Sequence, residues 1–358
     1  MIVSIWRKIY KQKHCVEESL HSVFLLATLF CFAYNSSKNG KCVDLLRFRK
    51  KWKSRFKRTR INIRGGDFVH SYLRAIGFSD VKNRADFQKI VGMVMEEPTE
   101  RHMVDLGNKI RLAEFKKEFM KDVGIGIVGE YDERGFFYLG HYFPYCKGCY
   151  ISTKEDVSIN KRVDTDAYTG MCDDLRFGVS MIFYLKNVCD FIRDGKMLQA
   201  VAKGGRVYLS ALSIEGKIIL GITQNDIQLR HKREERAMRK KLIMEAKCGN
   251  QEAIDSLTID DIDTYARVSR RIHSEDLYSI VDTSLIPYGS ESDNYSIVAT
   301  ILEWKAIKNF LTGEDLYSMT LCCNEMVFNL CINQKDLQGI PMIGARFKGN
   351  IWMQGDVR

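Results

Sequence analysis

The feature that most constrains the fold of this chain is the uneven distribution of its positive charge. Residues 1–66 contain 16 Lys and Arg against 3 Asp and Glu, whereas residues 67–358 contain 39 against 42. A net charge of +10 would favour a polyanionic partner such as a nucleic acid. Because the excess lies in the first 66 residues, the rest of the chain is mildly acidic, and nucleic acid is not its expected partner.

The first 66 residues form a basic leader that we expect to lie outside the fold. Its apolar run, Ser22–Tyr34, is 13 residues long, whereas a membrane span takes roughly 20. The basic run Lys50–Arg60 follows it and would oppose translocation. Gly65 and Gly66 can be encoded by a ribosome-binding sequence, and Val69 by a GTG start codon. We therefore expect a leader that is disordered or not natively translated; a membrane or signal role and a nucleic-acid-binding arm are the alternatives.

Residues 67–222 are predicted to form an α+β domain in which helices cover a sheet. Apolar residues at helical spacing predict short helices at His70–Phe78 and Asp86–Met95. Strand-like segments follow at 110–119, 122–133 and 134–145, with a turn at Asp132–Gly135.

Two apolar segments complete this predicted domain. Phe177–Arg193 is expected to be a core helix whose few polar positions include Lys186 and Asn187. Arg206–Ile222 is expected to be a hairpin that turns near Glu215 and Gly216.

Residues 223–288 are predicted to form a helical connector. The charged segment Asn225–Lys247 is typical of a solvated helix, with docking on a polyanion as the alternative. Two helices are expected after it, Gln251–Leu257 and one that begins behind Thr258. Acidic residues at the start of the second, Asp260, Asp261 and Asp263, favour the helix dipole.

Residues 289–358 read as strand, hairpin, short helix and final strand, which predicts a small β-barrel of the oligonucleotide/oligosaccharide-binding (OB-like) class. Its aromatic residues are Trp304, Phe310, Tyr317, Phe328, Phe347 and Trp352. They either stack the bases of a single-stranded nucleic acid or fill the barrel interior.

Several strings in a fixed order resemble one known family. They are HSYLRAIGF from His70, YFPY from Tyr142, GMCDDLRFGVSMIFYLKN from Gly170, EAIDSLTIDDIDTYARVSRRI from Glu252 and RFKGNIWMQG from Arg346. They are similar to an uncharacterised family of clostridial bacteria (Lachnospiraceae, within the Firmicutes) that is catalogued as a domain of unknown function, over Val69–Arg358. The resemblance implies that the leader is foreign to the fold. It carries no assigned activity.

The glycine motif GIGIVG, at Gly124, Gly126 and Gly129, has the glycine spacing of the dinucleotide-binding fingerprint but not its sequence context. A turn and another strand follow it instead of a helix. We therefore expect these glycines in a strand against which a neighbour packs closely, and we predict no cofactor.

Cys146 and Cys149 form a CxxC motif and are the candidate metal ligands. They supply two of the four ligands of a structural zinc, to which His141 or Cys172 could add a third. Two free thiols in a loop and a redox pair are the alternatives. The eleven cysteines are otherwise scattered, which favours free thiols in a reducing, cytoplasmic compartment.

No catalytic residues are predicted. Asp173 and Asp174 are expected to cap the helix that follows them, although two converging carboxylates could also act as acid and base. We expect a non-catalytic binding or assembly protein whose C-terminal barrel contacts a protein partner or a small ligand. An enzyme with a site assembled from distant residues, and single-stranded nucleic-acid binding through the barrel, are the alternatives.

Overall fold

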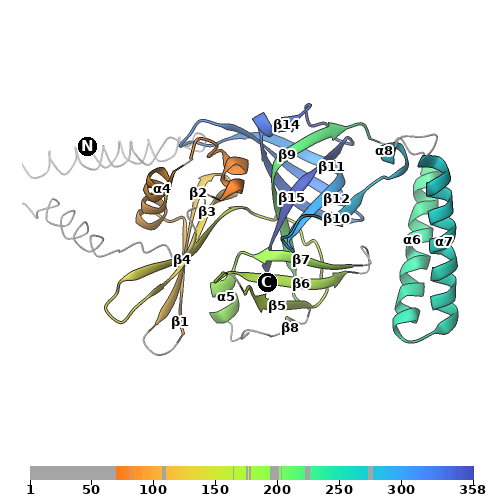
Figure 1. Cartoon of the computed structure of the whole chain (residues 1–358), viewed down its shortest axis with the longest axis horizontal. Helices are drawn as coiled ribbons and strands as arrows, with labels where there is room; N and C mark the ends of the chain where they lie inside the picture. The colour runs from red at the N-terminus through yellow and green to blue at the C-terminus, as the bar shows by residue number, and fades with distance from the viewer. Residues whose placement is uncertain are drawn as a thin grey trace, which may run out of the picture. The chain divides into compact units, whose positions relative to one another are not determined.

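The computed structural model describes residues 70–358 except positions 82, 107–109, 164, 175, 177–178, 194–200, 203, 222–225 and 273–276. The expectations for the basic leader, residues 1–66, fall on residues outside this described part. Within it, two β-sheets hold most of the elements and a few helices accompany them (Figure 1). The fold is therefore α+β, as the sequence predicts, with strands more numerous than helices.

Two helical segments open the described chain. η1 (Ser71–Ile76) is a short 3-10 helix that ends at Gly77, whose φ is 82°. α4 (Arg84–Glu96) begins behind Asn83, whose side chain accepts a hydrogen bond from the Asp86 backbone. Helical segments at both places were predicted from the apolar spacing.

A four-stranded antiparallel sheet follows. Its strands, in order, are β1 (Glu100–Asp105), β2 (Arg111–Met120), β3 (Val123–Tyr131) and β4 (Phe137–Cys146). The turn between β3 and β4 lies at the predicted position. It is held there because the backbone N–H groups of Arg134 and Phe136 both donate to the Asp132 carboxylate.

The glycines of GIGIVG lie within β3, so they form no dinucleotide-binding turn. A Cβ atom built on Gly126 would stand 2.4 Å from the Phe143 ring, and one on Gly124 would stand 2.0 Å from the Lys117 carbonyl oxygen. A methyl group cannot approach so closely. The prediction that neighbouring strands pack tightly against these glycines is confirmed.

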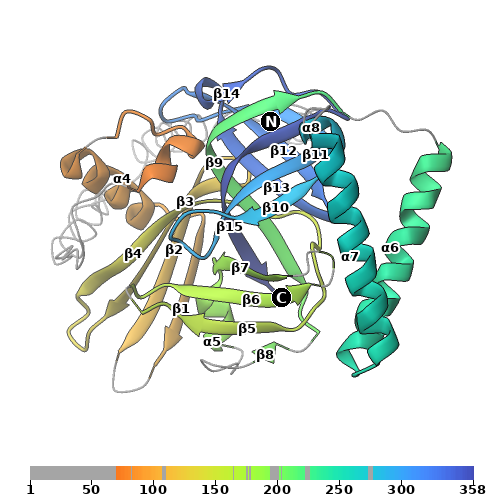
Figure 2. The ribbon, with the colours of Figure 1, turned by 45° about the vertical axis from the view of Figure 1, so that its right-hand side comes forward.

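Five strands of the second sheet close into a β-barrel. They are β9 (Val207–Ile219), β11 (Asn294–Lys308), β12 (Asp315–Cys323), β13 (Met326–Asn333) and β15 (Arg346–Val357). They pair in the order β11-β12-β13-β9-β15, and β15 pairs back with β11 (Figure 2). Alternate side chains such as Met319 and Leu321 are fully buried, so the strands share an apolar core.

η1 lies against one end of this barrel. The Asn309 side chain, at the end of β11, donates to the Ile76 carbonyl oxygen over 2.9 Å. The Asn333 side chain, at the end of β13, donates to the Arg74 carbonyl oxygen over 3.2 Å. The first helical segment is thus fixed to the last third of the chain.

The barrel differs from the prediction because it takes one strand from outside residues 289–358. The predicted hairpin in Arg206–Ile222 is wrong, since β9 runs unbroken through the expected turn, where Glu215 pairs with Asn350 and Gly216 with Gly349. Local pattern cannot separate a long strand from a tight hairpin. The pairing of β9 with the whole length of β15 decides between them.

The core helix predicted over Phe177–Arg193 is also wrong. This segment forms β7 (Val179–Leu185) and then the short helix α5 (Val188–Arg193). A continuous apolar run fits a buried strand as well as a buried helix. β7 is a strand because it pairs with the end of β15, and the sheet continues through β6 (Tyr168–Asp174), β5 (Val157–Lys161) and β8 (Val201–Ala202).

The acidic residues expected to cap helices lie elsewhere. Asp173 and Asp174 end strand β6, where Asp174 pairs with Arg176 and Asp173 accepts a hydrogen bond from Ser180. Asp260 and Asp261 lie inside a single helix where two were expected. The capping interpretation is therefore wrong for both groups.

The remaining elements are α6 (Asp226–Lys247), α7 (Gln251–Ile272), α8 (Leu277–Ile280), β10 (Ser284–Pro287), η2 (Gln334–Asp336) and β14 (Leu337–Gln338). α6 coincides with the charged segment that was predicted to be helical. Among the residues described, no helix has the length and apolar character that a bilayer crossing requires.

We expect a fragment of residues 281–358 to show no cooperative thermal unfolding, because it lacks β9 and cannot close the barrel. A fragment of residues 204–358 contains all five barrel strands and should unfold cooperatively. Circular dichroism during heating measures both. Cooperative unfolding of the shorter fragment would show that β9 is dispensable.

Candidate functional site

The four-stranded sheet contacts α5 through β1 and β2, and two hollows lie between this sheet and the rest of the described chain. The first, which we call the polar cavity, has a volume of about 80 Å³ and is lined by Glu100, His102, Lys116, Tyr145, Lys147, Lys186, Asn187, Asp190, Asp356 and Arg358. The second, which we call the cleft, has a volume of about 980 Å³ and lies on the other side of α5. Asp190 of α5 lines the polar cavity, and Ile192 of the same helix lines the cleft.

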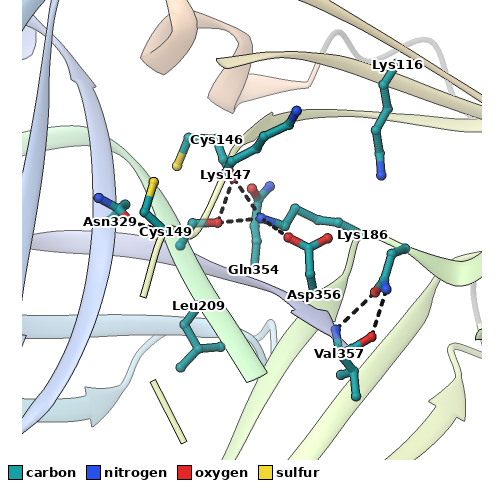
Figure 3. A network of polar contacts seen from close by, with 12 residues as sticks. Lys116, Cys146, Lys147, Cys149, Lys186, Leu209, Asn329, Gln354, Asp356 and Val357 are labelled. Atoms are coloured by element: carbon teal, nitrogen blue, oxygen red, sulfur yellow. Dashed lines mark hydrogen bonds and ion pairs between the residues drawn. The ribbon is translucent and has the colours of Figure 1, made fainter. Parts of the chain in front are cut away.

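Lys186 is the most deeply buried charge at the polar cavity. Its ammonium group donates to the Cys146 carbonyl oxygen and to Ser210 Oγ, each over 2.7 Å, and lies 3.1 Å from the Asp356 carboxylate (Figure 3). These partners belong to β4, β9 and β15. A buried ammonium needs such a complete set of partners, because it has lost its hydration.

Neighbouring amide groups extend this network along β15. The Asn187 side chain donates to the Val357 carbonyl oxygen and accepts from its N–H (Figure 3). The Gln354 side chain donates to the Pro144 carbonyl oxygen of β4 over 2.8 Å. The end of β15 is therefore bonded both to the four-stranded sheet and to the segment after β7.

Lys116 is a second buried cation, from β2, and its ammonium group lies 2.6 Å from the Glu114 carboxylate. Burial by itself would lower the pKa of Lys116, but the carboxylates of Glu114 and Asp356 outweigh this and raise it. Burial likewise favours a raised pKa for Asp356, yet Lys186 and Lys116 hold it below its ordinary value. Lys116 and Asp356 are therefore both charged near neutral pH.

The outer part of the polar cavity carries more ion pairs. Lys147 lies 2.6 Å from both Glu100 and Glu118. These two hydrogen bonds outweigh burial and raise the pKa of Lys147 to about 12. His102 of β1 lies 3.2 Å from Asp190 of α5.

Tyr145 differs from the other groups of the polar cavity. Its side chain is 1% exposed, and its hydroxyl group has no hydrogen-bond partner within the described part of the chain. Burial raises the pKa of Tyr145, so the hydroxyl stays neutral. One water needs roughly 10–15 Å³, so a cavity of about 80 Å³ has room for a small polar solute at this hydroxyl.

The cleft is larger and mostly apolar. Its walls include Met103, Val104, Leu112, Val128, Leu139 and Ile192. Leu106 and Ile110, which also line it, are 45% and 37% exposed. Volumes of about 300–1,000 Å³ and apolar walls are typical of pockets that hold small organic molecules.

One end of the cleft is polar. His141 Nε2 lies 2.8 Å from the Tyr184 hydroxyl, whereas Nδ1 is buried and has no protein partner among the described residues. Burial lowers the pKa of His141 to about 4, so the imidazole is neutral near pH 7. The ion pair between Lys161 and Asp166, at 2.8 Å, lines the same end.

The candidate metal ligands Cys146 and Cys149 lie close to the polar cavity without lining it. Cys146 is buried at the end of β4, where its thiol donates to the Ala211 carbonyl oxygen and burial raises its pKa. Cys149 is exposed, and its backbone N–H donates to Asn329 (Figure 3). No group of three or more His, Cys, Asp or Glu able to hold a metal occurs in the described ranges.

The two residues considered as further ligands also take part in other interactions. His141 bonds Tyr184 at the cleft, and Cys172 is a buried residue of β6 whose pKa burial raises to about 12. A metal site at Cys146 and Cys149 stays a prediction.

Most of the barrel aromatics that could stack bases lie in the interior. Phe328 and Phe347 are fully buried, and Tyr317 and Trp352 are 8% and 5% exposed. Trp304 and Phe310 are exposed.

The residues of the polar cavity were missed by sequence reasoning, with one partial signal. Lys186 and Asn187 interrupt an otherwise apolar segment, and such an interruption indicates a buried polar group with partners. No local sequence pattern indicates that Lys186 would meet Asp356 or Lys116, which lie 170 and 70 positions from it along the chain.

A family model described as a domain of unknown function from an E. rectale gene description (DUF3881) matches residues 73–355 of the chain. No curated protein and no solved structure matches the chain.

We expect Lys186→Met to lower the free energy of unfolding by about 3–5 kcal/mol, because it leaves the buried Asp356 carboxylate without its cation. The double variant Lys186→Met with Asp356→Leu removes both charges and should lose less. Urea denaturation measures both. A single variant within about 1 kcal/mol of wild type would contradict a structural role for the pair.

We also expect stability to fall as the pH drops from 6.5 towards 4. Burial lowers the pKa values of His70 and His141 to about 4, whereas unfolded histidine titrates near 6.5. In this window the unfolded state binds protons that the folded state excludes, at a cost of up to about 1.4 kcal/mol per pH unit for each histidine. His141→Gln should reduce the slope of unfolding free energy against pH, measured by urea denaturation.

The exposed His231 provides the matched control, and His231→Gln should leave the slope unchanged. An unchanged slope in His141→Gln would show that the ring of His141 is accessible to protons in the folded state.

Proposed function

The chain belongs to the family described as a domain of unknown function from an E. rectale gene description, and we propose that it is a binding protein whose cleft holds a small, largely apolar molecule. The single observation that carries the proposal is the cleft of about 980 Å³, whose lining is mostly apolar and includes the neutral imidazole of His141. A binding role was also expected from the sequence, although it was assigned to the barrel.

The polar end of the cleft indicates the chemistry of the ligand. Because burial lowers the pKa of His141 to about 4, the imidazole that lines the cleft carries no charge near pH 7. A neutral ring beside apolar walls favours an uncharged ligand, most of which lies along those walls.

The barrel is a less suitable site than the cleft. Its interior holds fully buried side chains such as Phe328 and Phe347, which leave these aromatic rings no face for a ligand or a base. We therefore place the ligand on the four-stranded sheet. Nucleic-acid binding through the barrel would depend on the exposed Trp304 and Phe310 alone.

The polar cavity favours a second candidate, an enzyme whose site is assembled from distant residues. Ionisable side chains from β1, β2, α5 and β15 converge there. Its three lysines, however, are engaged in ion pairs: Lys186 with Asp356, Lys116 with Glu114, and Lys147 with Glu100. Such pairing supports a role in holding the layers together, and for this reason the binding proposal is preferred.

We also propose that the protein works in the cytoplasm. Cys146, Cys172, Cys323 and Cys331 are buried free thiols. A reducing compartment keeps thiols in this state.

The proposal is tested by filling the cleft. Gly140 lines it, and a Cβ there would lie 3.3 Å from the Val128 carbonyl oxygen and no closer than 3.8 Å to any other atom. Gly140→Leu should therefore fold and occupy ligand space. We expect the neutral apolar dye Nile red to bind wild type at one site per chain, and Gly140→Leu to weaken it by about tenfold or more, since several apolar contacts are lost.

Gly92→Leu is the matched control, because Gly92 lies in α4, outside the cleft lining, and a Cβ added there would meet nothing within 4 Å. It should bind Nile red as wild type does. Fluorescence titration gives the affinities, and circular dichroism checks that both variants fold. Equal binding by Gly140→Leu and wild type, or binding that never saturates, would refute the cleft as the site.

A further inference from the structure

The hairpin of α6 and α7 leaves half of its described apolar side chains exposed to solvent. The two helices are joined by a short turn at Gly249, near which they approach each other, and they diverge away from it (Figure 2). Among their described side chains, Ala253 alone is buried. Exposed apolar residues include Met238, Met244, Ile254, Ile259, Ile262 and Tyr265. A helix pair normally gains its stability by burying such side chains, so this face is suited to a partner.

The exposed residues of α7 form a stripe. Ile254, Ile262 and Tyr265 are 37%, 61% and 76% exposed. At about 100° per residue, these three positions fall within an arc of about 80° on the helix surface. Arg239 of α6 pairs with Asp261 at 2.7 Å, and Asp261 lies about 20° from Ile254 around α7, so α6 borders this stripe while its residues stay exposed.

The charges of α7 are sorted by sign along the helix. All five of its acidic residues lie between Glu252 and Asp263, and its three basic residues are Arg267, Arg270 and Arg271. The change of sign falls between Asp263 and Arg267, just past the middle of the helix. An identical helix in antiparallel orientation would place the acidic end, with Glu252 and Asp255, beside the basic end, with Arg270 and Arg271, of the other copy.

α6 does not have this property. It contains eight Lys and Arg against four Asp and Glu, so two copies of α6 would repel each other along their length. Of the two helices, α7 is therefore the one whose two ends are complementary to each other in charge.

We propose that the apolar face of α7 binds α7 of a second copy of this chain, antiparallel and across a two-fold axis at Ile262. In this register, Ile262 meets its own counterpart and Tyr265 lies opposite Ile259. Residues 252–257 of one copy face residues 267–272 of the other. The two copies of α7 bury the stripe between them and pair the charges of their ends, whereas Asp261 of each copy lies opposite Asp263 of the other near the axis.

The charge pattern provides a test by exchange. In the full chain, Arg270→Glu with Arg271→Glu makes α7 wholly acidic at its ends, and Glu252→Lys with Asp255→Lys makes both ends basic. All four side chains are exposed, so folding should persist, and circular dichroism checks it. Wild type should sediment as a dimer. Each variant alone should be a monomer, and an equimolar mixture of the two variants should restore the dimer.

The result that would overturn the proposal is a wild-type monomer at about 100 µM, or variants that stay dimeric alone. A mixture that does not associate would equally overturn the antiparallel register, because only the mixed dimer pairs both ends.

A disulfide tests the position of the axis independently. With Cys149, Cys248 and the three leader cysteines changed to Ser, Ile262→Cys lies on the axis and should cross-link two chains on mild oxidation. Ile254→Cys is the matched control on the same stripe. It lies eight residues from the axis, about 24 Å from its counterpart at 1.5 Å per residue, beyond the roughly 7 Å that a disulfide allows. Cross-linking through Ile254→Cys, or none through Ile262→Cys, would contradict the register.

Discussion

The structure depends on one buried ammonium group. Lys186 stands just after β7, and its three partners come from β4, β9 and β15, so a single side chain joins the four-stranded sheet to the barrel. An ammonium in this position is tolerated only if every partner is in place, because the alternative is an unsolvated charge. The interaction therefore fixes the spacing of the two layers, and both hollows lie in the interface that this spacing creates.

The two hollows have opposite chemistry although both border the four-stranded sheet. On one side of α5, Lys116, Lys147 and Lys186 are all engaged with carboxylates. On the other side, the walls are apolar and His141 is neutral. The charged groups hold the layers together, and the apolar side retains free volume and a neutral imidazole. The proposed binding function follows from this division.

The sequence predicted many of the helices and strands but few of the residues of the candidate site. Cys146 and Cys149 formed a visible motif, yet the buried thiol of Cys146 bonds a backbone carbonyl while the exposed Cys149 lies apart. Lys186 carried a signal, as a charge within an apolar run, but its partner Asp356 lies at the other end of the domain sequence. His141 was considered only as a further metal ligand, and nothing in the sequence indicated that it lines a cleft. Side chains that are distant in sequence are brought together by the pairing between strands, which the sequence does not show.

The sequence alone determined where the regular segments lie wherever the pattern was local. The period of apolar residues predicted α4, the turn residues at Asp132–Gly135 predicted the β3–β4 hairpin, and the glycines of β3 indicated close packing. The tertiary structure decided the rest. Whether Phe177–Arg193 is helix or strand, and whether β9 turns or continues, depends on β15, which pairs with both segments. An apolar run lowers its free energy by burial in either conformation, so only the partner that satisfies its backbone hydrogen bonds selects one.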